Sequence, residues 1–266
     1  MYSKIQLAFK YIQYWCRSSN SKGHGVHSPF VFSFITDVLN DKGAYYCYEP
    51  VEQLRAALKQ DDTELEIADF GAGSRVNSSK RRKVSSIASS ALKPAKYSQL
   101  MFRMVNFYQP AVIVELGTSL GITTSYLANG NLKAAVTTME GAPAVASVAR
   151  NNFSRLQLEN ITLVEGNFDD TLAGVLNKLV APVDFAFVDG NHRYKPTMQY
   201  FEQLLAMSAD HTIIILDDIH WSNEMEQVWK EVQEHPAVTM TIDLFFIGIV
   251  LMRKEFKIKQ HFSVRF

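Results

Sequence analysis

The chain has 266 residues, of which 47 % are hydrophobic, and its 27 basic residues balance its 27 acidic residues. This amount of apolar material can form the core of one large α/β domain with an appendage, which excludes a disordered or fibrous chain. A net charge of zero gives no overall field that attracts a polyphosphate backbone, so we expect no nucleic acid partner.

The cysteines and the hydropathy pattern indicate the cellular compartment in which we expect the protein. The sequence has only Cys16 and Cys47, which argues against a disulfide framework or a thiolate zinc site. The first residues lack the apolar core of a signal peptide, and no stretch approaches the roughly 20 apolar residues that span a bilayer. We therefore expect a soluble, cytoplasmic protein without a membrane span.

Residues 1–94 are predicted to form a mainly helical region that contacts the substrate or covers the active site. Near its start Ile5, Phe9, Ile12 and Cys16 recur at helical spacing. Such a face can lie on a membrane surface, but we expect it to pack on the body of the protein, as in ordinary amphipathic helices.

Three loop segments of this region have two interpretations each. Residues 22–30 carry His24 and His27 and are either a lid over the active site or a surface connection. Residues 67–74 imitate a cofactor-binding glycine turn around Asp69, but a basic run follows and no acid-ended strand comes at ribose-binding distance. We expect a turn there, with the alternative that this loop borders the substrate pocket. The basic run Lys80–Lys83 either attracts an anionic substrate or is a solvated charged face.

From residue 95 to the end, the pattern predicts a second region built of alternating strands and helices. The predicted strands are 112–116, 135–139, 161–164, 185–188 and 213–216, and the predicted helices are 123–129, 142–156, 170–179, 197–207 and 223–234. Short apolar runs separated by crossover helices are typical of a doubly wound, mostly parallel sheet. Two further runs, 238–244 and 246–252, are joined so closely that they must be antiparallel neighbours.

The turn after the first of these strands is the main candidate for a ligand site. Glu115 lies in the strand, Gly117, Thr118, Ser119 and Gly121 follow, and a helix then begins. Ligands bind at this edge of a doubly wound sheet. A dinucleotide site requires G-x-G-x-x-G, whereas the spacing here is G-x-x-x-G, which weakens that interpretation.

Two other interpretations fit the same turn. It matches G-x-S-x-G, the nucleophile elbow of α/β hydrolases, with Ser119 as the nucleophile; however, that serine normally follows several strands of its sheet. A nucleoside cofactor without a diphosphate explains more residues, because Glu140 ends the next strand and is placed to accept hydrogen bonds from a ribose diol.

Five segments in order resemble the signature segments of class I S-adenosylmethionine-dependent methyltransferases, most closely the catechol and caffeoyl-coenzyme A O-methyltransferase group and its bacterial relatives. They are residues 115–121, Glu140, 165–168, 187–190 and 216–221, and residues 95–100 resemble the helix that precedes them. The resemblance covers roughly residues 95–253. It implies a Rossmann-like methyltransferase domain over residues 95–266, with S-adenosyl-L-methionine as the cofactor.

The resemblance also implies roles for the cofactor site. Gly117, Ser119 and Gly121 are expected near the methionine part, Glu115 near its ammonium and Glu140 at the ribose. Asn167 and Phe168 are expected at the adenine, although the family usually has an acid where Asn167 stands. Thr118, Gly141 and Asp189 complete the predicted set.

Acidic residues end two later strands and belong to the same edge of the sheet. Asp189, Asp217 and Asp218 would repel one another unless a cation or a bound ammonium neutralises them, and Mg²⁺ or another divalent ion suits carboxylate oxygens. The resemblance implies a metal trio here, in which Asp218 replaces an asparagine. The alternative is that these acids cap helices or bind loop amides, or that Asp189 contacts the cofactor amine.

The predicted catalytic residues are Asp189, His192 and Asp217. His192 is the preferred base because it shares a loop with Asp189, whereas His220 and Tyr194 are the other polar neighbours. The leading hypothesis is a methyltransferase that methylates an oxygen, or a nitrogen, of a small molecule by in-line transfer. The alternatives are a Ser119 hydrolase and a non-catalytic cofactor-binding module, while the acceptor and the oligomeric state, a homo-oligomer included, stay open.

Overall fold

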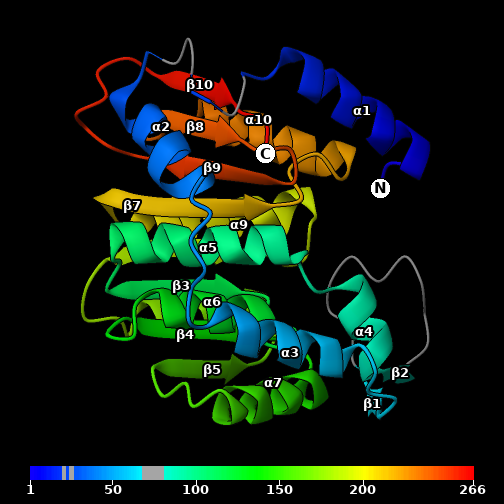
Figure 1. The fold of residues 1–266 in the computed structure, drawn as a ribbon. Helices are drawn as coiled ribbons and strands as arrows, with labels where there is room; N and C mark the ends of the chain where they lie inside the picture. Colours follow the sequence, from blue (N-terminus) through cyan, green and yellow to red (C-terminus); the bar gives the residue numbers. More distant parts are fainter. Residues whose placement is uncertain (20–21, 24–26, 68–80) are drawn as a thin grey trace. The chain divides into compact units, whose positions relative to one another are not determined.

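The computed structural model describes residues 1–19, 22–23, 27–67 and 81–266 (Figure 1). By their contacts these residues form two compact units, each described by itself below. Unit 1 joins Met1–Asp41 to Leu179–Phe266, and unit 2 is Lys42–Lys178. The helical N-terminal region is thus shared between both units, and its predicted functional boundary after residue 94 stays a prediction.

Unit 2 is built on three parallel strands in the order β3-β4-β5. These strands are β3 (Val112–Leu116), β4 (Ala135–Glu140) and β5 (Ile161–Glu165). Val112 lies opposite Ala135, and Val136 lies opposite Ile161, so the strands end at a common edge. All three match the predicted runs to within one residue, because short buried apolar segments leave little freedom in the assignment.

Helices connect and cover these strands. They are α5 (Ala95–Tyr108), α6 (Ile122–Gly130), α7 (Pro143–Arg155) and α8 (Phe168–Leu176), with α3 (Tyr48–Leu58) and α4 (Val84–Ser90) from the N-terminal region. A buried cluster joins α3 and α4 to the start of α6, through side chains such as Leu54, Ile87, Ile122 and Tyr126. The two short antiparallel strands β1 (Glu64–Glu66) and β2 (Arg81–Lys83) were not predicted.

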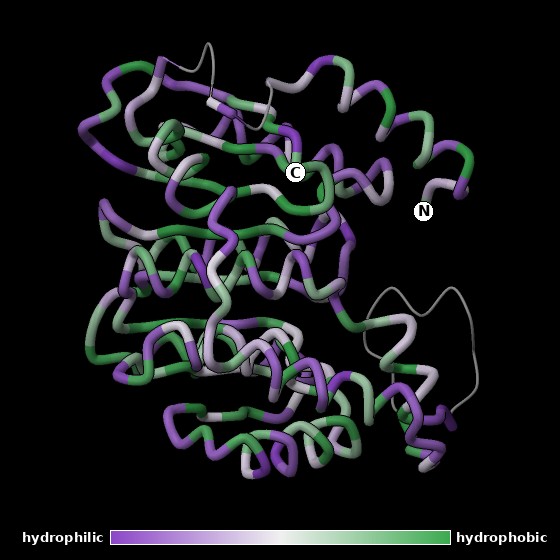
Figure 2. The backbone as a smooth tube through the Cα atoms, in the orientation of Figure 1, coloured by the Kyte–Doolittle hydropathy of each residue, from purple (hydrophilic) through white to green (hydrophobic). Residues whose placement is uncertain are grey.

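Unit 1 contains the remaining strands, in the order β10-β8-β9-β7-β6. They are β6 (Val183–Val188), β7 (Ser208–Asp217), β8 (Met240–Asp243), β9 (Ile247–Leu251) and β10 (Gln260–Ser263). β6 and β7 are parallel, and β9 runs antiparallel to both β7 and β8. The mostly parallel fold with one reversed strand is therefore confirmed, and Figure 2 shows hydrophobic colour along much of β7, whose residues 212–217 are buried. The strand β10, which pairs with β8, was missed because its sequence is polar.

The helices of unit 1 are α1 (Lys4–Arg17), α2 (Pro29–Ser33), the π-helix η1 (Phe34–Leu39), α9 (Tyr194–Ala206) and α10 (Asn223–Glu234). The expectation that the Ile5 face of α1 packs on the protein is wrong, since Ile5 is 84 % and Phe9 61 % exposed. The helix packs instead through the opposite face, where Tyr14 is buried. Within the described parts of the chain, no helix combines the length and hydrophobicity needed to cross a bilayer.

Candidate active site

The glycine turn of unit 2 follows β3 and leads into α6. Three of its residues have positive φ, at 106° for Gly117, 48° for Ser119 and 82° for Gly121. Glycine adopts this region without steric cost, whereas Ser119 is strained there. The amides of Gly117 and Thr118 both donate to the carbonyl of Met139 at 3.0 Å, which ties the turn to the end of β4.

The side chain of Glu140, the last residue of β4, bonds back to the glycine turn. Its Oε2 accepts a hydrogen bond from the Ser119 amide at 2.8 Å, and its Oε1 accepts one from the Ala142 amide at 2.9 Å. The predicted convergence of the turn and Glu140 is therefore present within unit 2. A carboxylate in this place, at the end of the strand next to a glycine turn, is the kind of group that accepts hydrogen bonds from a ribose diol.

Glu115 lies beneath the turn and is completely buried. Its Oε2 accepts hydrogen bonds from the hydroxyls of Thr124 and Thr138, and the Thr138 hydroxyl is also 2.6 Å from that of Thr118. Oε1 has no hydrogen-bond partner among the described residues. Burial raises the pKa of Glu115 to about 7, against the effect of the two threonine hydroxyls. Sequence reasoning missed this threonine network, because nothing in the spacing marks the three hydroxyls as neighbours.

Two of the predicted cofactor residues also have local structural roles. A Cβ added to Gly121 would lie 2.5 Å from Cε1 of Phe153, so this glycine lets the start of α6 approach α7. The side chain of Asn167 caps α8 by accepting a hydrogen bond from the Asp169 amide at 3.2 Å. Gly141 and Phe168 are half-buried near the ends of β4 and β5.

A second polar cluster lies in unit 1, at the end of β7 and in the loop after β6. One ligand atom from each of Asp189, His192 and Asp217 can be chosen so that all three lie within 4.8 Å of one another. Nε2 of His192 is 3.6 Å from Oδ1 of Asp189, and Asp217 is 1 % exposed. The three predicted catalytic residues are thus gathered in one place, with a donor set of two carboxylates and one imidazole.

The loop after β6 shapes this cluster. Asn191 and His192 both have positive φ, at 67° and 48°, which turns the chain so that His192 faces back to Asp189. The ring of Trp221 meets the His192 ring edge to face at 5.6 Å between centroids. Trp221 is a further residue beside the cluster that sequence reasoning did not single out.

Other polar residues predicted nearby do not join the metal-ligand group found among the described residues. Asp218 has a φ of 52°, and its amide donates to the carbonyl of Phe246 at 2.6 Å. The hydroxyl of Tyr194 donates to Glu231 at 2.5 Å. Among the described residues, the possible ligand group contains His192 together with Asp189 and Asp217, and the trio with Asp218 stays a prediction.

His220 belongs to a separate network. Its two ring nitrogens lie 2.8 Å from Asp243 and 3.2 Å from Glu226. Although burial lowers the pKa of His220, the hydrogen bonds to these two carboxylates raise it to about 9. A histidine that stays protonated is a poor base at neutral pH, which favours His192 for that role.

The loop hypotheses of the N-terminal region have different outcomes. His24, the loop around Asp69 and Lys80 lie outside the described residues, and His27 is exposed. In the β1–β2 pair, Arg81 lies opposite Glu66, and Lys83 lies opposite Glu64. Two residues of the basic run are therefore paired with acidic residues. This pairing favours the charged-surface interpretation of residues 81–83.

The hydrolase interpretation of Ser119 finds no support within unit 2. A serine nucleophile needs a histidine base within hydrogen-bond reach, and the sequence has no histidine between residues 42 and 178. The amide of Ser119 is instead bonded to Glu140. The local geometry therefore fits a cofactor turn better than a nucleophile elbow.

Comparisons with known proteins agree with this geometry. Residues 114–219 match the family described as a methyltransferase domain. Among solved structures, the chain is similar to the O-methyltransferase from Bacillus cereus in complex with SAH (TM-score 0.55, 23 % identity, covering 84 % of this chain and 97 % of that one). It is also similar to cofactor-bound Rv0187 from MTB (TM-score 0.58, 19 % identity, 84 % and 95 % covered).

A third similar structure is the O-methyltransferase TomG from Streptomyces achromogenes in complex with SAM (TM-score 0.54, 18 % identity, 62 % and 82 % covered). A comparison with curated proteins finds no match. The fold is that of the Rossmann-like class I methyltransferases, as predicted. Residues 114–219 of the chain thus carry a methyltransferase domain.

Proposed function

We propose that this protein transfers the methyl group of S-adenosylmethionine directly to an oxygen of a small molecule. The observation that carries the proposal is the closed arrangement of the Ser119 amide and the Glu140 carboxylate at the end of two parallel strands. The similar proteins from Bacillus cereus and Streptomyces achromogenes are O-methyltransferases that bind SAH and SAM, which supports the choice of cofactor and acceptor atom.

The cofactor roles are proposed for unit 2. Glu140 would accept both ribose hydroxyls, and the backbone at Gly117, Thr118 and Ser119 would lie along the methionine part. Gly141 and Phe168 would border the nucleoside, with Asn167 held at the adenine by its capping bond to α8. Glu115 is completely buried below the turn, so it would not touch the cofactor ammonium. Its role would be to hold in place the threonines that lie under the turn.

The acceptor roles are proposed for unit 1. His192 would take the proton from the acceptor hydroxyl, while Asp189, 3.6 Å away, would stabilise the imidazolium that forms. Asp189 is also proposed to approach the cofactor amine. The methyl group then moves in one displacement to the oxygen, with no covalent enzyme intermediate, so the main task of the site is alignment.

The same cluster has the chemistry of a metal site. Asp189, His192 and Asp217 could supply two oxygens and one nitrogen to a divalent cation, a set that suits Mn²⁺ or Zn²⁺ as well as Mg²⁺. A bound cation would lower the pKa of a coordinated acceptor hydroxyl. Asp218 would serve as an outer acid rather than as a ligand. We propose a cytoplasmic location, in keeping with two free thiols, Cys16 and Cys47.

Titration with S-adenosylhomocysteine tests the cofactor site. We expect micromolar binding by calorimetry, and Glu140→Ala should weaken it by about tenfold or more, because a charge-assisted bond to the ribose is lost. Glu165→Ala is the matched control, since Glu165 ends β5 and pairs with Arg150 on the surface. Equal affinities in wild type and Glu140→Ala would contradict the proposal.

Turnover tests the chemistry. We expect S-adenosylhomocysteine to form from S-adenosylmethionine with a catechol-type or other phenolic acceptor, with and without added divalent cations. Labelling of Ser119 by a fluorophosphonate without any methyl transfer would favour the hydrolase. Cofactor binding without turnover across a broad acceptor panel would favour the non-catalytic module.

A further inference from the structure

Helix α1 has two faces with different surroundings. The inner face attaches to unit 1, since Tyr14 is 8 % exposed and Lys10 forms an ion pair with Glu226 at 2.8 Å. The hydroxyl of Tyr2 donates to the same Glu226 at 2.7 Å, and Nε of Arg265 donates to the carbonyl of Trp15 at 2.7 Å. The helix is therefore held at both ends, which leaves its other face to solvent.

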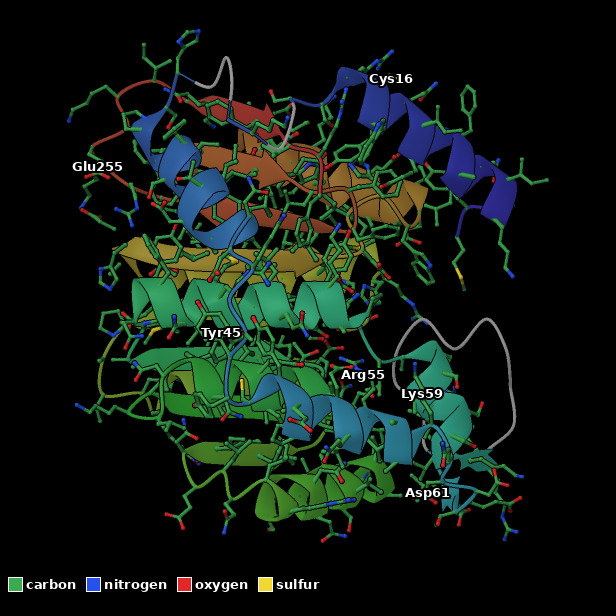
Figure 3. The ribbon with its side chains drawn as sticks, in the orientation of Figure 1. Cys16, Tyr45, Arg55, Lys59, Asp61 and Glu255 are labelled. Atoms are coloured by element: carbon green, nitrogen blue, oxygen red, sulfur yellow. The ribbon has the colours of Figure 1, made fainter. Side chains whose placement is uncertain are left out.

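The outer face, defined as Ile5, Phe9, Ile12, Trp15 and Cys16, is apolar and exposed. The exposed fractions are 84 % for Ile5, 61 % for Phe9, 59 % for Ile12 and 43 % for Trp15. Figure 2 shows hydrophobic and hydrophilic segments alternating along α1, and Figure 3 labels Cys16 near the carboxyl-terminal end of the helix. Exposed bulky residues in one contiguous face mark a surface that another body covers.

The charges around the outer face indicate what that body is. The helix contains Lys4, Lys10 and Arg17 and no acidic residue. Lys4 and Arg17 are exposed in the first and last turns, and the guanidinium of Arg265 lies over the Trp15 ring at 5.3 Å. Cations that flank an apolar face with an aromatic residue at its edge are typical of helices that lie in the interface of an anionic bilayer.

A second copy of the chain fits this face less well. In a symmetric dimer the same patch meets itself, so two helices without acids would bring their own lysines and arginines together. A lipid surface with negative headgroups has the complementary charge and accepts the convex face of a single helix.

We propose that the outer face of α1 lies on anionic membrane surfaces, with Ile5, Phe9 and Ile12 inserted among the acyl chains and Lys4 and Arg17 at the phosphates. This places the enzyme at a bilayer without a membrane span. The proposal does not depend on the reaction that the protein catalyses.

Co-sedimentation with vesicles tests the proposal. The full chain is expected to bind vesicles of phosphatidylcholine with phosphatidylserine, and to be released at about 0.5 M salt, because screening removes the headgroup attraction. The double variant Ile5→Ser, Phe9→Ser should lower the partition coefficient by about tenfold or more, through loss of apolar insertion. The matched control is Val180→Ser, Ile258→Ser, which removes two residues of similar exposure, at 102 % and 74 %, and should bind like wild type.

An environment-sensitive fluorophore on Cys16 gives a second measurement. Cys47 is buried, and burial raises the pKa of its thiol to about 12, so labelling should favour Cys16. Vesicles with phosphatidylserine should shift the emission to the blue. Protein that stays in the supernatant, equal binding to pure phosphatidylcholine, or a dimer by light scattering that the Ile5→Ser, Phe9→Ser variant dissociates would each overturn the proposal.

Discussion

The acidic side chains have different surroundings in the two units. In unit 2, Glu140 is held by two backbone amides and Glu115 by two threonine hydroxyls, so the geometry around the glycine turn is fixed before any ligand binds. In unit 1, Asp189 and Asp217 are gathered beside His192, where like charges repel. The first arrangement fixes a shape, whereas the second gathers two carboxylates and an imidazole, which are groups that can move a proton or hold a cation.

The largest effect should follow from neutralising the cluster. Asp217→Asn is expected to lower kcat by about a thousandfold, because the acceptor hydroxyl loses the charge that assists its deprotonation. The affinity for S-adenosylhomocysteine should change by less than about twofold. The melting temperature should change little, since asparagine keeps the size and shape of the aspartate side chain. Enzyme kinetics, calorimetry and thermal unfolding measure these three quantities.

Asp184→Asn is the matched control for that variant. Asp184 also forms an aspartate–histidine pair in unit 1, with His211 at 2.6 Å, but this pair lies outside the cluster. Its kcat should equal that of wild type. A parallel fall of kcat and cofactor affinity in Asp217→Asn would remove the proposed separation of roles between the units.

The next effect concerns the fixed shape of unit 2. Gly121→Ala should lower the free energy of unfolding by about 2–4 kcal/mol, because a Cβ at a φ of 82° is strained and would lie 2.5 Å from the Phe153 ring. Urea unfolding measures the loss. Gly174→Ala, in α8 with open space around the new Cβ, should be neutral or stabilising. A stable Gly121→Ala protein would show that the turn relaxes easily.

The smallest effect is a change in pH dependence. The pKa of Glu115 is raised from 4.5 to about 7, so between these values the folded protein keeps a proton that the unfolded chain releases. Stability should therefore fall as the pH rises from 4.5 to 7, by at most about 3 kcal/mol, and change no further above that range through this group. In Glu115→Gln this slope should be absent, so the curves of stability against pH for wild type and variant should not be parallel between pH 4.5 and 7. Parallel curves would mean that Glu115 is already ionised in the folded protein.

The sequence predicted well the positions that follow from the order and direction of the strands alone. Strands that alternate with helices place Gly117, Glu140, Asp189 and Asp217 at strand ends, so their clustering within each unit followed from topology. Side-chain networks that depend on packing could not be derived in this way, as with the threonines around Glu115. The exposed face of α1 was misjudged because helical periodicity shows that a face is apolar and not what covers it.

The attachment of α1 has a practical consequence for the loop that contains Trp221. The Tyr2 amide donates to the carbonyl of Trp221 at 3.0 Å, and the Trp221 ring lies against His192. Removing the first few residues, by a protease or in a shortened clone, would remove the hydrogen bond between Tyr2 and Trp221. The residue that packs against His192 would then be held less firmly. Protein that includes residues 1–3 and protein that lacks them are therefore expected to differ around His192, even when both contain residues 114–219.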